Sequence, residues 1–180
     1  ASVGYNHPKI LSNLDLLGKV SISKPTLSDV YNVHYADFVN TFNEIAIPDY
    51  LKHAFFIEGG SLAVENALKI AFDWKVRKNI ENGKGKEKGR QIIHFKQAFH
   101  GRSGYTLSLT NTSDPRKTMY FPKFDWPRID NPYLSFPITE DAINDVKQKE
   151  DEAIKQIYKA IKQNPDDIAG LIIEPIQGEG

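Results

Sequence analysis

The sequence predicts an α/β protein with a mainly parallel sheet, because three short apolar runs alternate with helical patterns. The runs are Ala54–Ile57, Gln91–Phe95 and Ile168–Ile173. Consecutive apolar residues over four to six positions are typical of strands that are buried on both faces. Strands that alternate with helices usually form a sheet with helices packed on it. We therefore expect a three-layer α/β/α core within residues 54–180.

Segments with helical spacing lie between and before these strands. Leu62–Asn79 is expected to form a long helix, and Thr139–Lys162 a second one, with Thr139, Glu140 and Asp141 at its start. Lys9–Leu17 is expected to form a short helix, and another should start near Pro25–Ser28 and end before Pro48. The residues predicted to face the core from the two long helices are Leu62, Ala63, Val64, Ala67, Leu68, Ala71, Phe72, Val76, Ile143, Val146, Ile154, Ile157 and Ile161.

The segment Asp114–Pro137 is predicted to be a long ordered loop. Its five prolines disfavour regular helix and central strand. Its many aromatic residues argue against disorder. Long ordered loops often border a functional site or a subunit interface, so we expect this one to pack on the domain.

Composition excludes several classes of function. The 180 residues contain 23 Lys and Arg against 23 Asp and Glu, so no basic field favours nucleic acid or an anionic membrane. The absence of cysteine excludes disulfides and cysteine-based zinc sites, and no HExxH-type spacing predicts another metal site. No apolar run is long enough to cross a bilayer, and no signal-peptide pattern is present. The expected location is the cytoplasm.

A glycine-rich turn precedes the first long helix. In Glu58-Gly59-Gly60-Ser61 the two glycines allow close approach of the backbone to a ligand, and the Ser61 hydroxyl can add a hydrogen bond. Free N–H groups at a positive helix end bind phosphate readily. The turn has neither the lysine of a P-loop nor the spacing of a dinucleotide fingerprint. A plain tight turn with Ser61 as a helix cap is the alternative.

A second turn follows the strand Gln91–Phe95. It is expected to expose Phe99, His100 and Arg102 at the carboxyl end of the strand, where ligands bind in open α/β sheets. An aromatic ring can stack on a flat ligand, and a guanidinium can hold a carboxylate or phosphate. The alternative is an ordinary packed loop.

The third strand also ends in polar residues. Glu174 and Glu179 follow Ile168–Ile173. Because the carboxyl ends of parallel strands share one edge of a sheet, these carboxylates should lie near the two turns. An aromatic, phosphorylated ligand together with an acidic small molecule fits that combination of groups. Pyridoxal 5′-phosphate with an amino-acid substrate meets the description.

Four motifs resemble the class III, fold-type I aminotransferases, which depend on pyridoxal 5′-phosphate. They are GYNHP, FFIEGGSLAVENALK, QAFHGRSGYTLSLT and AGLIIEPIQGEG, in that order along the chain. A further stretch, FPKFDWPRIDNPY, is similar to members that act on L-lysine. The resemblance covers nearly the whole chain. It implies transfer of the ε-amino group of L-lysine to 2-oxoglutarate, which yields glutamate and 2-aminoadipate 6-semialdehyde.

The resemblance also implies a role for each matching residue. Gly60 and Ser61 correspond to the cup for the cofactor phosphate, and Phe99 and His100 to the wall beside the pyridine ring. Arg102 corresponds to the arginine that grips the substrate carboxylate, for which a planar fork is suited. Two glutamates also match. Glu179 corresponds to the gating glutamate, which pairs with an arginine when lysine binds and releases it for 2-oxoglutarate. Glu174 corresponds to an active-site glutamate to which no role is assigned.

The resemblance places the Schiff-base lysine and the aspartate at the pyridine nitrogen beyond Gly180. Residues 1–180 are therefore expected to be the central part of a large cofactor domain, cut at both ends, with residues 1–25 as a leading segment. Such a piece should be inactive alone, since the covalent step needs the amine. The resemblance further implies a homodimer, and hence exposed apolar surface. The alternatives are a class III enzyme for ornithine or 4-aminobutyrate, and a non-catalytic α/β binding domain.

Overall fold

The computed structural model describes residues 3–23 and 31–178, and its chain divides into two compact units, residues 1–57 and 58–180. The first unit contains the helices α1 (Pro8–Leu11), α2 (Leu14–Ser21) and α3 (Val33–Ile45). The second contains the helices α4 (Gly60–Glu81), α5 (Thr106–Leu109) and α6 (Glu140–Gln163), a short 3-10 turn η1 (Pro115–Lys117), and the strands β1 (Gln91–Phe95), β2 (Arg128–Ile129) and β3 (Ile168–Leu171). No helix in these two ranges is long and apolar enough to cross a membrane.

In the first unit an aromatic cluster packs α3 against Phe56. The rings of Phe38 and Phe42 on α3 meet the ring of Phe56 edge-on, with centroids 5.1 and 5.4 Å apart. Tyr35 joins the same cluster at 6.2 Å from Phe56. The Asn32 side chain caps α3 by accepting a hydrogen bond from the Tyr35 N–H at 2.9 Å. The start predicted at Pro25–Ser28 lies outside the described residues, and the N-cap of α3 in the structure is Asn32.

The prediction of a strand at Ala54–Ile57 is wrong. The segment has no strand structure and only Phe56 is partly buried. A β-strand exists only where a neighbour accepts and donates its backbone hydrogen bonds. Among the described residues, strands pair only with one another in the order β2-β1-β3, and this segment has no partner. Phe56 packs into the aromatic cluster of α3 instead, and the other three residues of the segment are exposed.

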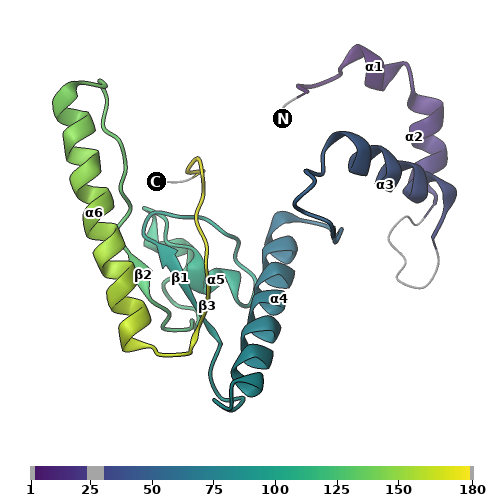
Figure 1. Cartoon of the computed structure of the whole chain (residues 1–180). Coiled ribbons are helices and arrows are strands. Elements are labelled where there is room, and N and C mark those ends of the chain that lie inside the picture. The colour runs from purple at the N-terminus through teal and green to yellow at the C-terminus, as the bar shows by residue number, and fades with distance from the viewer. Residues whose placement is uncertain (1–2, 24–30, 179–180) are drawn as a thin grey trace. The chain divides into compact units, whose positions relative to one another are not determined.

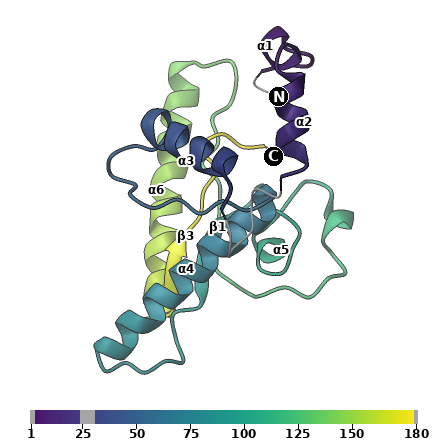
Figure 2. The same cartoon turned by 90° about the vertical axis from the view of Figure 1, so that its right-hand side faces the viewer.

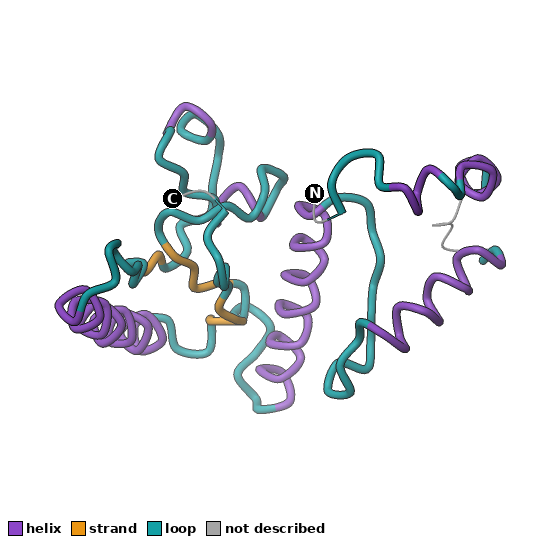
Figure 3. The backbone as a smooth tube through the Cα atoms, turned by 90° about the horizontal axis from the view of Figure 1, so that it is seen from above, coloured by secondary structure: helices purple, strands orange, loops and turns teal. Residues whose placement is uncertain are grey.

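The second unit is a three-layer α/β/α arrangement, as predicted. β1 lies in the middle of a three-stranded parallel sheet, with β2 on one side and β3 on the other. Figure 1 shows α4 and α6 on opposite sides of this sheet, and the view in Figure 3 places the strands between the two helices. The connections run through α5 and α6, as parallel strands require.

Alternation along β1 divides the core between the two faces of the sheet. Ile92 packs with Leu68 of α4, and also with Leu109, Trp126 and Ala169. Ile93 and Phe95 point to the other face, where they pack with Ile129 and with Ala153 and Ala160 of α6. Small alanines let α6 approach the sheet closely. The prediction of the core-facing residues of α6 was wrong in part. Ile143, Ile154 and Ile161 are exposed, and of the predicted residues only Ile157 packs against the core.

The buried face of α4 is also narrower than predicted. Of its eight expected core residues only Leu68 is fully buried, while Leu62, Ala63 and Ala67 are exposed. The helix begins at Gly60 rather than Leu62 and ends at Glu81 rather than Asn79. One charged side chain shares the buried face: Glu65 is 7% exposed.

The segment Asp114–Pro137 is ordered and packed on the domain, as predicted. Phe124 stacks on the buried Trp126 with ring centroids 5.0 Å apart, and Trp126 stacks on Tyr105 at 6.3 Å. The sequence missed the two-residue strand β2 within this segment. β2 lies at the edge of the sheet, where neighbouring prolines are tolerated because one side of the strand has no partner strand.

A buried histidine connects β1 to this edge strand. Arg128 Nε donates to His94 Nε2 at 3.0 Å, and since arginine only donates, His94 carries its proton on Nδ1, 3.3 Å from the Ile92 carbonyl oxygen. Burial lowers the pKa of the His94 imidazole to about 4. Arg128 Nη2 also donates to the Ser108 carbonyl at 3.1 Å. Arg128 is thus held by the His94 ring and by the Ser108 carbonyl, so it links β2 to β1 and to the end of α5.

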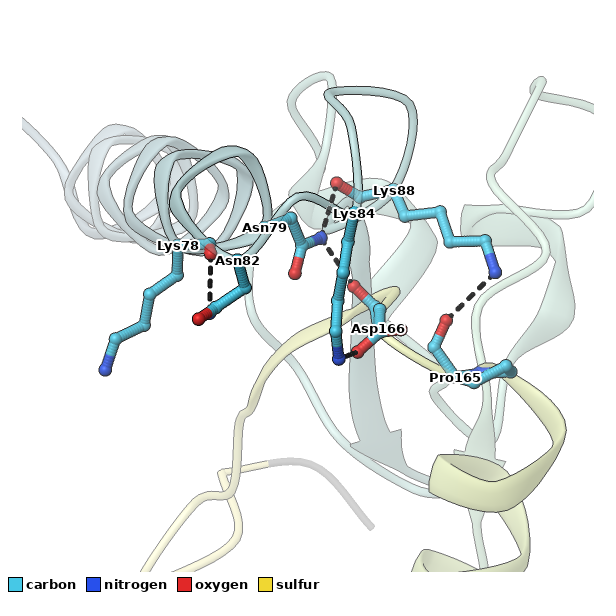
Figure 4. A network of polar contacts seen from close by, with 7 residues as sticks. All are labelled: Lys78, Asn79, Asn82, Lys84, Lys88, Pro165 and Asp166. Carbon is cyan, nitrogen blue, oxygen red and sulfur yellow. Dashed lines mark hydrogen bonds and ion pairs between the residues drawn. The ribbon is translucent and has the colours of Figure 1, made fainter.

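Asn79 joins two loops at the far end of α4 (Figure 4). Asn79 is buried, with 2% of its surface exposed. Its Nδ2 donates to the Lys88 carbonyl at 3.1 Å and to the Asp166 carbonyl at 2.8 Å. Lys88 leads into β1 and Asp166 into β3, so one amide holds the entrances of both strands. An ion pair between Lys84 and Asp166 lies beside it.

Asn79→Ala is expected to lower the free energy of unfolding by about 1–3 kcal/mol, because two backbone carbonyl oxygens would lose the buried amide that donates to them. Asn82→Ala is the matched control, since Asn82 is exposed at the same helix end and donates only to the Lys78 carbonyl of its own helix. Urea denaturation of both variants measures the difference. Equal stability of the two would contradict a linking role for Asn79.

Candidate active site

The two predicted turns meet in one open cavity of about 660 Å³. Its wall is formed by the start of α4 and by the turn that follows β1, through Gly60, Ser61, Val64, Phe99, His100, Gly101, Arg102 and Ser103. The five residues predicted for cofactor and substrate from these turns are therefore neighbours. Figure 2 shows α5, which continues the second turn, beside the N-terminal half of α4.

The start of α4 is shaped for an anion. Gly59 is the N-cap residue with φ of +85°, a conformation that favours glycine, and it contributes no side-chain cap. The first turn of α4 contains no acidic residue. Because the first N–H groups of a helix have no partner within the helix, this end of α4 attracts negative charge. Ser61 is thus not the cap but the second residue of the helix.

Three hydrogen bonds hold the turn after β1. The Phe99 N–H donates to Glu174 Oε2, beyond the end of β3, at 3.2 Å. The Thr110 hydroxyl accepts from the His100 N–H at 3.0 Å and donates to the Gly101 carbonyl at 2.6 Å. These bonds connect the turn to β3 and to the end of α5. Phe99 as a whole is 36% exposed, and it lines the cavity.

His100 is buried, which corrects the prediction that it is exposed. The residue is 8% exposed, and its Nε2 has no hydrogen-bond partner among the described residues. Burial lowers the pKa of the His100 imidazole, while the nearby Glu174 carboxylate acts to raise it. The backbone of the residue is held by the one hydrogen bond that its N–H donates to the Thr110 hydroxyl. A neutral ring in the wall of the cavity suits packing against an aromatic ligand better than charge neutralisation.

Arg102 is exposed and lies between two hollows. It lines the cavity described above and a neighbouring one of about 670 Å³, formed with Ser103, Gly104, Leu107, Lys117, Phe121 and Pro122. A guanidinium in that place is accessible to a carboxylate that enters either hollow. Glu174 is partly buried and holds the turn, and Glu179 lies outside the described residues.

The sequence reasoning missed the polar residues behind the wall of the cavity. Ser103 and Thr106 bond to the Ser61 hydroxyl at 2.6 and 3.0 Å, and Glu65 accepts from Ser103 at 2.8 Å. One feature of the sequence could have indicated these residues. Glu65 lies one turn before Leu68 on the apolar side of a helix, where an unpaired charge is costly.

The chain matches the aminotransferase class-III family over residues 1–180. This match over the full length agrees with the order of the motifs, with the three-layer fold and with the cavity at the start of α4. The chain belongs to the class-III aminotransferases.

Among its relatives are several L-lysine-epsilon aminotransferases. The one from Mycobacterium tuberculosis is 49% identical over 183 residues, which cover 100% of this chain and 40% of the relative, and the one from Amycolatopsis lactamdurans is 44% identical with the same coverage. A 4-aminobutyrate aminotransferase from Dictyostelium discoideum is 30% identical over 99% of this chain. The chain spans about 40% of the length of these curated relatives.

Solved structures agree with the fold. A lysine aminotransferase from M. tuberculosis in the internal aldimine form superimposes with a TM-score of 0.88 and 48% identity, over 97% of this chain and 40% of that one. An omega-aminotransferase from Paracoccus denitrificans, at 19% identity and a TM-score of 0.70, shares the fold. The α/β architecture deduced from periodicity is therefore confirmed.

Proposed function

We propose that the protein containing this chain is a pyridoxal 5′-phosphate-dependent aminotransferase that transfers the ε-amino group of L-lysine to 2-oxoglutarate. Its products would be glutamate and 2-aminoadipate 6-semialdehyde. The observation that carries the proposal is the single cavity that unites the start of α4, the Phe99 ring and the Arg102 guanidinium in a class-III aminotransferase chain. The high identity to L-lysine-epsilon aminotransferases supports lysine as the donor.

The residues of the cavity fit the cofactor. Gly60 and Ser61 offer backbone N–H groups and a hydroxyl at a positive helix end, which suits a phosphate. Phe99 offers a half-exposed ring at the same cavity, which suits the flat pyridine. When bound, the cofactor supplies the electron sink for the reaction.

This chain's own residues would bind and orient the substrate. Arg102 would hold the α-carboxylate of lysine through paired N–H groups, and a fixed carboxylate orients the ε-amino end toward the ring wall. Glu174 would keep Phe99 in place through the Phe99 N–H. Glu179, at the predicted gate, would release its arginine partner when 2-oxoglutarate replaces lysine.

Homodimer formation also belongs to the proposal. Class-III resemblance implies a dimer with the site at the interface, and such an interface would cover apolar side chains. The second unit leaves several aromatic residues widely exposed, among them Tyr120 and Phe136 of the ordered loop. These side chains support an interface on the loop.

The proposal is tested by donor assays on the full-length gene product, with 2-oxoglutarate as acceptor and with lysine, ornithine and 4-aminobutyrate as donors. We expect lysine to give the highest kcat/KM, and borohydride reduction to leave one pyridoxyl group per subunit. A preference for ornithine or 4-aminobutyrate would refute the lysine assignment. A protein that binds no pyridoxal phosphate and turns over no donor would refute the enzyme and favour a binding domain.

A further inference from the structure

A buried carboxylate lies directly behind the proposed phosphate cup. Glu65, in the second turn of α4, is 7% exposed, and its Oε1 accepts three hydrogen bonds. The donors are Ser103 Oγ at 2.8 Å, the Tyr105 N–H at 2.6 Å and the Thr106 N–H at 3.1 Å. None of the roles assigned above uses Glu65.

Three hydroxyls form a triangle between this carboxylate and the cavity. Ser61 Oγ lies 2.6 Å from Ser103 Oγ and 3.0 Å from Thr106 Oγ1, and the last two atoms are 2.9 Å apart. Each hydroxyl has one hydrogen to donate. Because Ser103 Oγ donates to Glu65 Oε1, the single hydrogen of Ser103 is committed to Glu65. The short contact between Ser61 and Ser103 must therefore use the hydrogen of Ser61.

Because the hydrogen of Ser61 is the one that lies between Ser61 and Ser103, the Ser61 hydroxyl can rotate and donate that hydrogen elsewhere. When an anion occupies the cavity, Ser61 can point its hydrogen outward, because its oxygen can accept the hydrogen of Thr106 Oγ1 at 3.0 Å. Thr106 Oγ1 in turn accepts from the Ser103 N–H at 3.0 Å. Every hydroxyl keeps a partner in both arrangements, so the turn costs little, and a chain of hydrogen bonds strengthens the outward donor.

We propose that Glu65 is a positioning residue, which fixes the direction of the hydrogen bonds among Ser61, Ser103 and Thr106 so that Ser61 donates to a phosphate group in the cavity. Without Glu65, the Ser103 hydrogen can point at Ser61 or Thr106, and the inner N–H groups of Tyr105 and Thr106 lose their acceptor. The inference rests on the proposed function, since the phosphate is that of the cofactor.

The test compares the affinity of the full-length gene product for pyridoxal 5′-phosphate with its affinity for pyridoxal, which has no phosphate. Absorbance titration measures both. Glu65→Ala is expected to lower the ratio of the two affinities about tenfold, the effect of one unsatisfied hydrogen bond. Glu65→Gln keeps a carbonyl oxygen at the Oε1 position, and is expected to keep the ratio within about threefold of the unmodified protein.

A second pair of variants tests the triangle without changing Glu65. Thr106→Val removes the hydroxyl that donates to Ser61 and should also lower the ratio about tenfold, whereas Thr106→Ser should restore it. Glu81→Ala is the matched control, because Glu81 is an exposed glutamate at the other end of α4. This control should leave both affinities unchanged. The Thr106 pair decides the question even if Glu65→Ala fails to fold.

Two outcomes overturn the inference alone: Glu65→Ala and Thr106→Val weaken both ligands equally, or Glu65→Gln loses as much selectivity as Glu65→Ala. Equal weakening would mean that Glu65 only supports the fold, and loss in Glu65→Gln would mean that its charge matters rather than its acceptor atom. An unmodified protein that bound both ligands equally would overturn the proposed function, and the inference with it.

Discussion

Replacing Gly101 with alanine is expected to abolish cofactor binding and to lower the free energy of unfolding by about 3 kcal/mol or more, through backbone strain and overpacking together. Gly101 has φ of +118°, where side chains are strained. An added Cβ would lie 2.3 Å from Ser61 Oγ, 2.7 Å from Ser61 Cβ and 2.8 Å from Thr106 Oγ1. Both neighbours are held by the hydroxyl triangle, so neither can move without breaking it.

Gly104→Ala is the matched control in the same turn. A Cβ at Gly104 would meet nothing closer than Glu65 Oε1 at 3.7 Å, which is ordinary contact. Chemical denaturation and titration with pyridoxal 5′-phosphate compare the two variants. If Gly101→Ala were as stable as Gly104→Ala and bound the cofactor normally, the close approach of this turn to α4 would not be required for the cup.

Arg102→Ala is expected to raise the KM for lysine about 100-fold while leaving pyridoxal 5′-phosphate bound, because a paired charge-assisted contact to a carboxylate is among the stronger hydrogen-bond interactions. Arg102 is exposed on the wall of the cavity, and it takes no part in the hydrogen bonds among the hydroxyls of Ser61, Ser103 and Thr106. Its loss should therefore affect substrate capture rather than the cofactor. Steady-state kinetics and the absorbance of the bound cofactor measure the two effects separately.

Two variants serve as controls for Arg102. Arg102→Lys keeps the charge without the planar fork, and should recover only part of the affinity for lysine. Arg116→Ala removes another exposed arginine, one paired with Asp114 and not part of the cavity, and should leave KM unchanged. Loss of the cofactor in Arg102→Ala to the same extent as loss of substrate affinity would contradict its assignment to the substrate.

Local patterns in the sequence were sufficient where the structure depends on neighbours along the chain. The apolar run of β1 appeared at its predicted bounds, and α6 began one residue after its predicted start, Thr139, which caps the helix by accepting from the Ala142 N–H at 3.2 Å. Strand and helix periods are properties of consecutive residues, so they can be read without knowledge of the fold. The family motifs likewise identified Gly60, Ser61, Phe99, His100 and Arg102, which the structure brings to one cavity.

The failures share a cause. Ala54–Ile57 has the composition of a strand but no strand beside it, and β2 has little strand composition but pairs with the end of β1 through His94 and Phe95. Burial of Ala153 and Ala160 instead of larger neighbours depends on how closely α6 lies on the sheet. Pairing and distance of approach are relations between distant segments, and no periodicity in one segment specifies them.

By itself the sequence determined the α/β class, the main helices and the residue types of a phosphate, ring and carboxylate site, because these follow from local periodicity and motif order. Only the tertiary structure decided which polar atoms stand behind that site. Glu65 meets Ser103 and Thr106 across 38 and 41 positions of chain. A hydrogen bond needs two atoms at about 3 Å, and folding alone brings residues so far apart in sequence to that distance.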